Sequence, residues 1–241
     1  MVPISFVEKR KRWQKGQEEH LAKILMSPPE RITFRKAIPF PGVVVIMGAK
    51  GEGKSALAYE VMNQLHKTHG AKGCIFVPPH LAGIVKKLKG LVPAWVTIVT
   101  DLKSLPKGAV VLIDEASQSA HARRTQAKQS LDLDALVGIS RQKGQLIIFI
   151  SHHSRKLDPN LIHECDRILW KRPTYAHALF ERSEISDFTF KALEFFNGIK
   201  GKLTIKKTVL MMDFHNLRFA TFRNGIPPWW SEKISTIFEH V

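Results

Sequence analysis

The chain has 241 residues and is 44% hydrophobic, which suits one domain with a sizeable core, or one domain with a small appendage. Lys and Arg outnumber Asp and Glu by 37 to 21, a formal net charge of +16. Such an excess favours a polyanionic partner, with nucleic acid ahead of a membrane surface. Two cysteines, Cys74 and Cys165, argue against a disulfide scaffold, and no signal peptide or apolar run of roughly 20 residues is recognisable. We therefore expect a soluble cytoplasmic protein with no membrane partner.

Residues 1–36 predict a basic helical segment. Residues 5–26 have an incomplete apolar stripe among clustered Lys and Arg, and the sequence Ser27-Pro28-Pro29 ends the pattern. DNA, a neighbouring subunit or solvent all remain open as the surroundings of this helix. The following residues 31–38, "RITFRKAI", predict an edge strand.

Residues 37–172 predict a core in which strands alternate with helices. Short continuous apolar runs are typical of strands buried on both faces. Five such runs occur, at 43–47, 74–77, 96–99, 109–113 and 146–150, and Arg167–Trp170 predicts a further short strand. Helical spacing is found at 54–69 and at 129–141. This alternation predicts an α/β fold with a mostly parallel central sheet flanked by helices.

Residues 173–241 predict a strand-containing C-terminal extension packed on the core. The sequence "KKTVLMMDFHNLRFATFRNG" predicts a hairpin that turns near His215 and Asn216. Trp229 and Trp230 follow two prolines and are expected to anchor the segment to the core, with stacking on bases as the alternative.

The sequence "GAKGEGKS" at 48–55 matches the phosphate-binding pattern G-x-x-x-x-G-K-[ST], directly after an apolar strand and at the start of a helix. Its glycines allow the backbone to curl and to aim N–H groups at phosphate oxygens. Lys54 can reach the β- and γ-phosphates, and the Ser55 hydroxyl can bind Mg²⁺. We predict that ATP is held by nine consecutive residues: Gly48, Ala49, Lys50, Gly51, Glu52, Gly53, Lys54, Ser55 and Ala56.

The sequence "AVVLIDEAS" places Asp114 and Glu115 at the end of an apolar strand, where ionised carboxylates need water, a cation or a donor. Beside a P-loop, Asp114 is predicted to hold Mg²⁺ together with Ser55. Glu115 is predicted to be the general base that polarises the attacking water. A water-activating glutamate suits ATP hydrolysis rather than transfer of phosphate to a small molecule.

The strand at 146–150 is preceded by Arg141 and ends on Ser151 and His152, in "SRQKGQLIIFISH". A P-loop, an Asp-Glu strand and a strand with a polar tip follow the order of the additional-strand, catalytic-glutamate (ASCE) ATPases. With an Arg and a Gly before the last strand, residues 40–172 resemble the FtsK/HerA superfamily. That superfamily contains DNA pumps, conjugation ATPases and viral genome-packaging ATPases.

The resemblance implies that the last strand lies between the P-loop strand and the Asp-Glu strand, so that Ser151 and His152 face the γ-phosphate. Glutamine is common in the family at the position of His152, and a neutral imidazole can also donate to a phosphate oxygen. Arg141 would be an arginine finger that reaches the ATP of the next subunit. Three other arginines are alternatives for this role: Arg123, Arg124 and Arg155. The implied catalytic residues are Lys54, Glu115, Arg141 and His152.

The resemblance also implies an ATP-hydrolysing translocase of double-stranded DNA. A viral or mobile-element packaging ATPase is the favoured member, acting as a homo-pentameric or homo-hexameric ring with a capsid or portal partner, in the host cytoplasm if viral. One alternative is an AAA-type ATPase that regulates DNA transposition or repair, which a small helical lid after the core would favour. Another is a P-loop phosphotransferase or nucleotide switch without DNA, against which the net charge of +16 counts.

Overall fold

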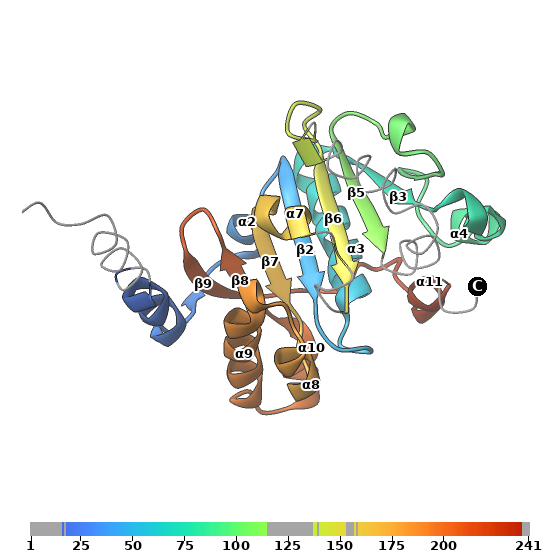
Figure 1. The fold of residues 1–241 in the computed structure, drawn as a ribbon. Helices are drawn as coiled ribbons and strands as arrows, with labels where there is room; N and C mark the ends of the chain where they lie inside the picture. Colours follow the sequence, from blue (N-terminus) through green and yellow to red (C-terminus); the bar gives the residue numbers. More distant parts are fainter. Residues whose placement is uncertain are drawn as a thin grey trace, which may run out of the picture.

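The computed structural model describes residues 16, 18–114, 137–138, 140–152, 157 and 159–237. Nine strands in these residues form one mixed sheet in the order β1-β9-β8-β7-β2-β6-β5-β3-β4 (Figure 1). The six core strands are all parallel to one another. They are β2 (Gly42–Met47), β3 (Lys72–Phe76), β4 (Val96–Val99), β5 (Ala109–Asp114), β6 (Leu146–Ser151) and β7 (Arg167–Trp170).

The remaining strands extend the sheet beyond β7. Strands β8 (Thr208–Asp213) and β9 (Arg218–Arg223) form an antiparallel hairpin, and β8 pairs antiparallel with β7. The two-residue strand β1 (Glu30–Arg31) pairs with β9 at the edge. The predicted C-terminal extension therefore shares one hydrogen-bonded sheet with the core.

Helices cover both faces of the sheet. The described helices are α2 (Phe34–Ala37), α3 (Lys54–His69), α4 (Val85–Lys89), α7 (Pro159–Glu164), α8 (Tyr175–Leu179), α9 (Ser183–Asn197), α10 (Lys202–Lys207) and α11 (Glu232–Thr236), with 3-10 turns η1 (Pro79–Ile84) and η2 (Leu102–Ser104). Helices α8, α9 and α10 gather at the end of the sheet to which the arrowheads of β7 and β2 point (Figure 1).

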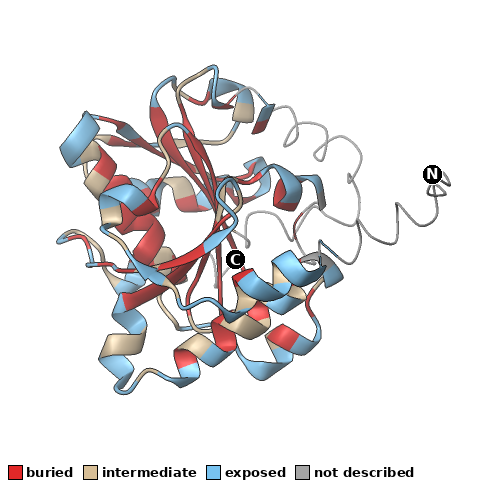
Figure 2. Cartoon of the chain, turned by 90° about the vertical axis from the view of Figure 1, so that its left-hand side faces the viewer, coloured by how far each residue is buried: buried red, intermediate tan, exposed pale blue. Residues whose placement is uncertain are grey.

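Strand β2 illustrates why the central strands read as continuous apolar runs. Val44 and Ile46 belong to one apolar cluster, with residues of α2, α3, α4 and α11. Val43 and Val45 belong to a second cluster, with residues of α7 and α9. Since side chains alternate between the two faces of a strand, both faces must be apolar when helices cover both. The middle of the sheet is buried along its length (Figure 2).

The predicted α/β class with a mostly parallel sheet is confirmed. All six predicted core strands form, as do the predicted helix at 54–69 and the C-terminal hairpin. Residues 129–136 of the next predicted helix lie outside the described residues. Of the basic helix predicted at 5–26, the described residues 18–26 are helical. No helix among the described residues is long and apolar enough to cross a membrane.

The edge strand predicted at 31–38 is largely wrong. Only Glu30 and Arg31 pair with β9, and residues 34–37 form the helical turn α2. A helical turn places positions i and i+3 on one side, so Phe34 packs edge-on against Phe222 while Ala37 is buried. An extended chain would direct these two side chains to opposite faces.

The segment after β9 crosses the face of the sheet that α3 covers. Trp229 packs edge-on against Tyr59 of α3, with ring centroids 5.4 Å apart, and against Trp95, 5.9 Å away. Its indole Nε1 donates to the Asn63 side chain at 3.3 Å. The packing matches the expectation that this tryptophan anchors the C-terminal segment to the core.

Candidate nucleotide-binding site

The P-loop lies between the end of β2 and the first residue of α3. Its glycines Gly48, Gly51 and Gly53 have φ values of 142°, 77° and 87°, which side chains with a Cβ rarely adopt. At Gly48 space is also limiting, because a Cβ there would lie 2.6 Å from the carbonyl oxygen of Lys171. The loop has this shape because glycine permits both the conformation and the close approach.

Lys54, the first residue of α3, has a buried side chain that turns back over the loop. Its Nζ donates to the carbonyl oxygens of Gly48 at 2.8 Å and Ala49 at 3.0 Å. It also lies 2.9 Å from Nδ1 of His152. The ammonium group carries only donors, so Nδ1 must accept, and the proton of a neutral imidazole is assigned to Nε2. The structure thus brings together two predicted site residues that are 98 positions apart.

This contact follows from the strand order. Strand β6 lies between β2 and β5, as the family resemblance implied. Met47 at the end of β2 is level with Ser151, and Asp114 at the end of β5 is level with Ile150. The P-loop and the polar tips of β5 and β6 therefore meet at one edge of the sheet. Ser151 itself is fully buried.

Asp114 lies close to the helix that the P-loop begins. Burial raises the pKa of Tyr59 on α3, and the negative charge of Asp114 raises it further. Ser55 occupies the first turn of the same helix. A hydroxyl and a carboxylate are the hard oxygen donors that Mg²⁺ prefers, so Ser55 and Asp114 are a chemically suitable pair for this ion.

A third strand tip at this edge was not predicted from the sequence. After β7, Lys171 and Arg172 run along the P-loop, and the Ala49 N–H donates to the Arg172 carbonyl at 3.0 Å. The Arg172 guanidinium pairs with Glu52 of the loop at 2.6 Å. The signal was present, because two cations directly after a buried strand repeat the pattern of polar residues after β5 and β6.

Arg141 lies at the other end of the strands, beside the amino ends of β6 and β7. It precedes β6 and forms an ion pair with Asp166, which precedes β7, and its side chain is 64% exposed. The structure does not bring it to the P-loop of its own chain. Four other residues considered in the sequence lie outside the described residues: Glu115, Arg123, Arg124 and Arg155.

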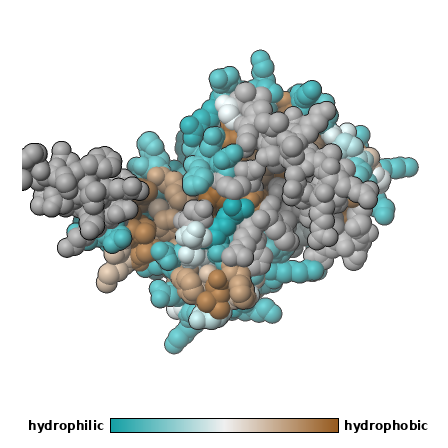
Figure 3. Space-filling model, viewed as in Figure 1, coloured by the Kyte–Doolittle hydropathy of each residue, from teal (hydrophilic) through white to brown (hydrophobic). Residues whose placement is uncertain are grey.

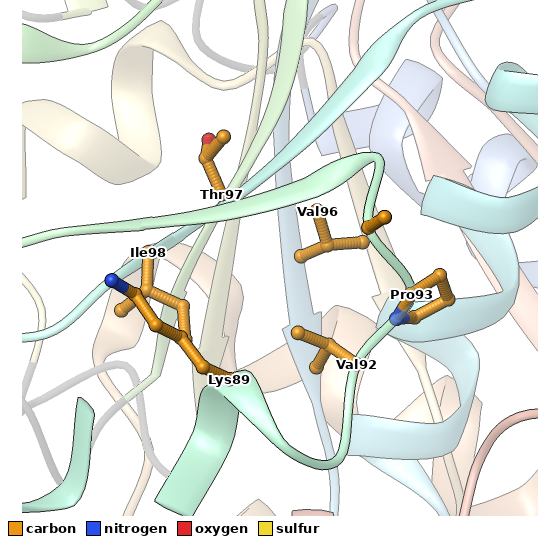
Figure 4. Close-up of a pocket in the computed structure, with 7 residues that line it drawn as sticks. Lys89, Val92, Pro93, Val96, Thr97 and Ile98 are labelled. Carbon is orange, nitrogen blue, oxygen red and sulfur yellow. The ribbon is translucent and has the colours of Figure 1, made fainter. Parts of the chain in front are cut away.

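Two surface pockets do not include the P-loop. One of about 380 Å³ lies beside the edge strand β4 (Figure 4). It is lined by Lys89, Val92, Pro93, Ala94, Val96, Thr97 and Ile98. Another of about 360 Å³ lies between α2 and the end of α3 and includes Phe34, Phe40 and Leu65 among its lining residues. Neither pocket contains a predicted site residue.

Exposed apolar side chains gather on α8 and α10, near the carboxyl edge of the sheet (Figure 3). We call them the α8–α10 patch; its residues are Tyr175 and Leu179 of α8, Phe180 directly after α8, and Leu203 of α10. Contiguous exposed apolar side chains on a protein surface often mark an interaction site.

Comparison with known families identifies one match. The model of the family described as "ATPase family associated with various cellular activities (AAA)" matches residues 44–173, from β2 to just beyond Arg172. None of the curated proteins compared with the chain matches it.

Several solved structures share the fold. B204, the DNA-packaging ATPase from Sulfolobus turreted icosahedral virus, is 19% identical with a TM-score of 0.53, over 76% of this chain and 98% of that one. The genome-packaging NTPase B204 of Sulfolobus turreted icosahedral virus 2, in complex with ATP-γ-S, is 18% identical with a TM-score of 0.52, over 76% and 97%. The pCW3 conjugation coupling protein TcpA is 12% identical with a TM-score of 0.51, over 77% and 60%. The predicted resemblance to packaging and conjugation ATPases is confirmed at the level of the fold.

Proposed function

We propose that this chain, which belongs to the AAA family of ATPases and hydrolyses ATP, couples hydrolysis to the movement of double-stranded DNA. The observation that carries the proposal is a P-loop fold shared with DNA-packaging ATPases on a chain with a net charge of +16. A polyanion is the natural partner for such a charge. Within this class, we favour packaging of a viral or mobile-element genome.

The proposed chemistry begins with the P-loop. Lys54 exchanges its bonds to the Gly48 and Ala49 carbonyls for bonds to the β- and γ-phosphate oxygens, and the loop N–H groups bind the phosphates. Ser55 and Asp114 would hold Mg²⁺, which neutralises charge on the phosphate oxygens when bound.

Two further residues would act at the γ-phosphate. Glu115 accepts a proton from the attacking water as the general base. His152 lies beside Lys54 and, with its proton on Nε2, donates to the γ-phosphate or to the water. The same lysine contacts both the loop and His152. Loss of the γ-phosphate would therefore change the contacts of His152, which directly follows β6.

We propose that the motor is a homo-oligomeric ring of five or six subunits. Arg141 is exposed and lies far from the P-loop of its own chain, as suits a residue that acts on the ATP of a neighbour. The α8–α10 patch near the P-loop edge supports a contact between subunits. Basic loops would contact the DNA backbone without reading sequence, and a capsid or portal would be the further partner.

A second candidate is an AAA-type ATPase that regulates DNA transposition or repair. One observation favours it: helices α8, α9 and α10 follow the core directly, where a helical lid would lie. The hairpin β8–β9 counts against it, because it continues the core sheet rather than forming a separate helical unit.

The test is ATP hydrolysis by the wild type and Glu115→Gln, with and without long double-stranded DNA, over a series of salt concentrations. We expect DNA to stimulate the wild type, the stimulation to fade with salt, and the variant to be inactive. Glu194→Gln, on the exposed side of α9, is the matched control and should behave as wild type. Hydrolysis that ignores DNA at every salt concentration would overturn the translocase proposal and favour a phosphotransferase or switch.

A further inference from the structure

One buried lysine joins the C-terminal extension to the P-loop. The Lys171 side chain is fully buried. Its Nζ donates to the carbonyl oxygens of Lys206 at 2.6 Å and Thr208 at 3.2 Å, and to Oδ1 of Asn224 at 2.7 Å. Lys206 lies in the last turn of α10, Thr208 begins β8 and Asn224 follows β9. One side-chain amine therefore forms hydrogen bonds at both ends of the hairpin.

The same residue forms one wall of the P-loop. Its carbonyl oxygen lies 2.6 Å from where a Cβ on Gly48 would be, and its Cε lies 3.7 Å from the corresponding point on Gly53. The side chain thus runs along the loop from its first glycine to its last. The neighbouring Arg172 adds a backbone bond to Ala49. Movement of Lys171 would change the space in which the loop curls.

We propose that Lys171 is a positioning residue for ATP hydrolysis, whose side-chain amine holds the β8–β9 hairpin and the end of α10 against the P-loop. The loop then keeps the curvature that phosphate binding requires. This inference rests on the ATPase activity at this P-loop and not on the proposed movement of DNA. It makes the C-terminal extension part of the nucleotide site.

The chemistry of the amine supports a positioning role. Three oxygen acceptors surround the amine, which donates three protons when charged and still donates two when neutral. Burying a charge is costly, and an apolar side chain of similar length would fill the same space. A group that costs stability yet is fully hydrogen-bonded is better explained by the geometry it imposes than by the stability it adds.

The test compares Lys171→Met, which keeps the length and removes the charge, with Lys202→Met, which removes an exposed amine from α10. Binding of a non-hydrolysable ATP analogue, and KM and kcat without DNA, are measured separately. We expect Lys171→Met to fold and to lose kcat/KM on the order of 10²-fold, because a small displacement of the phosphate-binding loop misaligns the reacting groups. The control should stay within about twofold of wild type.

Asn224→Leu provides an independent measurement, because it removes one acceptor and keeps the lysine. It should lower kcat/KM about tenfold, and the double variant should be no worse than Lys171→Met alone, since both changes break the same contact. If Lys171→Met fails to fold, Asn224→Leu decides. Wild-type analogue binding, KM and kcat in a folded variant would overturn the proposal, even if its stability were reduced.

Discussion

Raising the pH should stabilise the wild-type protein relative to Lys171→Met. Burial lowers the pKa of the Lys171 amine from its ordinary value of 10.5 to about 7, and the negative charge of Glu52 opposes this shift only in part. Between these two pH values the amine is protonated in the unfolded chain and neutral in the folded one. The unfolded state binds more protons there, so the free energy of unfolding rises with pH.

The size of the effect follows from the same two values. Each pH unit within the interval adds at most about 1.4 kcal/mol to the free energy of unfolding. From about pH 7.5 to about pH 9.5 the wild type should therefore gain roughly 2 to 3 kcal/mol on the variant. Below about pH 7 the amine is protonated in both states, and the difference should be constant.

Urea unfolding at several pH values measures this difference. Other groups titrate in both proteins, so they cancel when the variant is subtracted from the wild type. Lys202→Met removes an exposed amine and should follow the wild type at every pH. A difference between wild type and Lys171→Met that stays flat within about 0.5 kcal/mol across the interval would refute the reasoning.

Three further predictions concern other parts of the molecule. Gly48→Ala should abolish binding of an ATP analogue, because the added Cβ would lie 2.6 Å from the Lys171 carbonyl oxygen; wild-type affinity in a titration would contradict that geometry. Trp229→Ala should lower the free energy of unfolding by roughly 2 to 3 kcal/mol, since its partly buried ring packs on Tyr59; urea unfolding that shows a loss under about 1 kcal/mol would mean that the C-terminal segment is not anchored there. Arg141→Ala should cost less than about 1 kcal/mol, because its ion pair is exposed; a much larger loss on thermal unfolding would show a structural role.

The strands and the P-loop could be predicted because their signals are local. Continuous apolar runs mark strands covered on both faces, and the loop pattern follows one of them directly. Helix α9 also has a local signal, since Ile185, Phe188, Ala192 and Phe196 recur at helical spacing. It was not predicted, because the apolar runs of the hairpin that follows indicate strands.

The surroundings of Lys171 could not be predicted in the same way. A lysine at the end of a strand is ordinarily solvated. Its burial depends on α10, β8 and the residue after β9, and its three hydrogen-bond partners there lie 35 or more positions away in the chain. The pairing of Arg141 with Asp166 is equally non-local, because it joins residues that precede two different strands.

The pairing of β8 with β7 has a consequence for the integrity of the core. Without the hairpin, β7 would become an edge strand, and its backbone N–H and C=O groups on that side would lose their partners. Four consecutive residues, Arg167–Trp170, would then be free to pair with a strand of another chain. The neighbouring Lys171 would also lose its hydrogen-bond partners from α10 and the hairpin. A fragment ending at residue 173, where the family match ends, would retain the whole phosphate-binding motif and yet be prone to self-association, so this boundary is not one at which the protein can be cut.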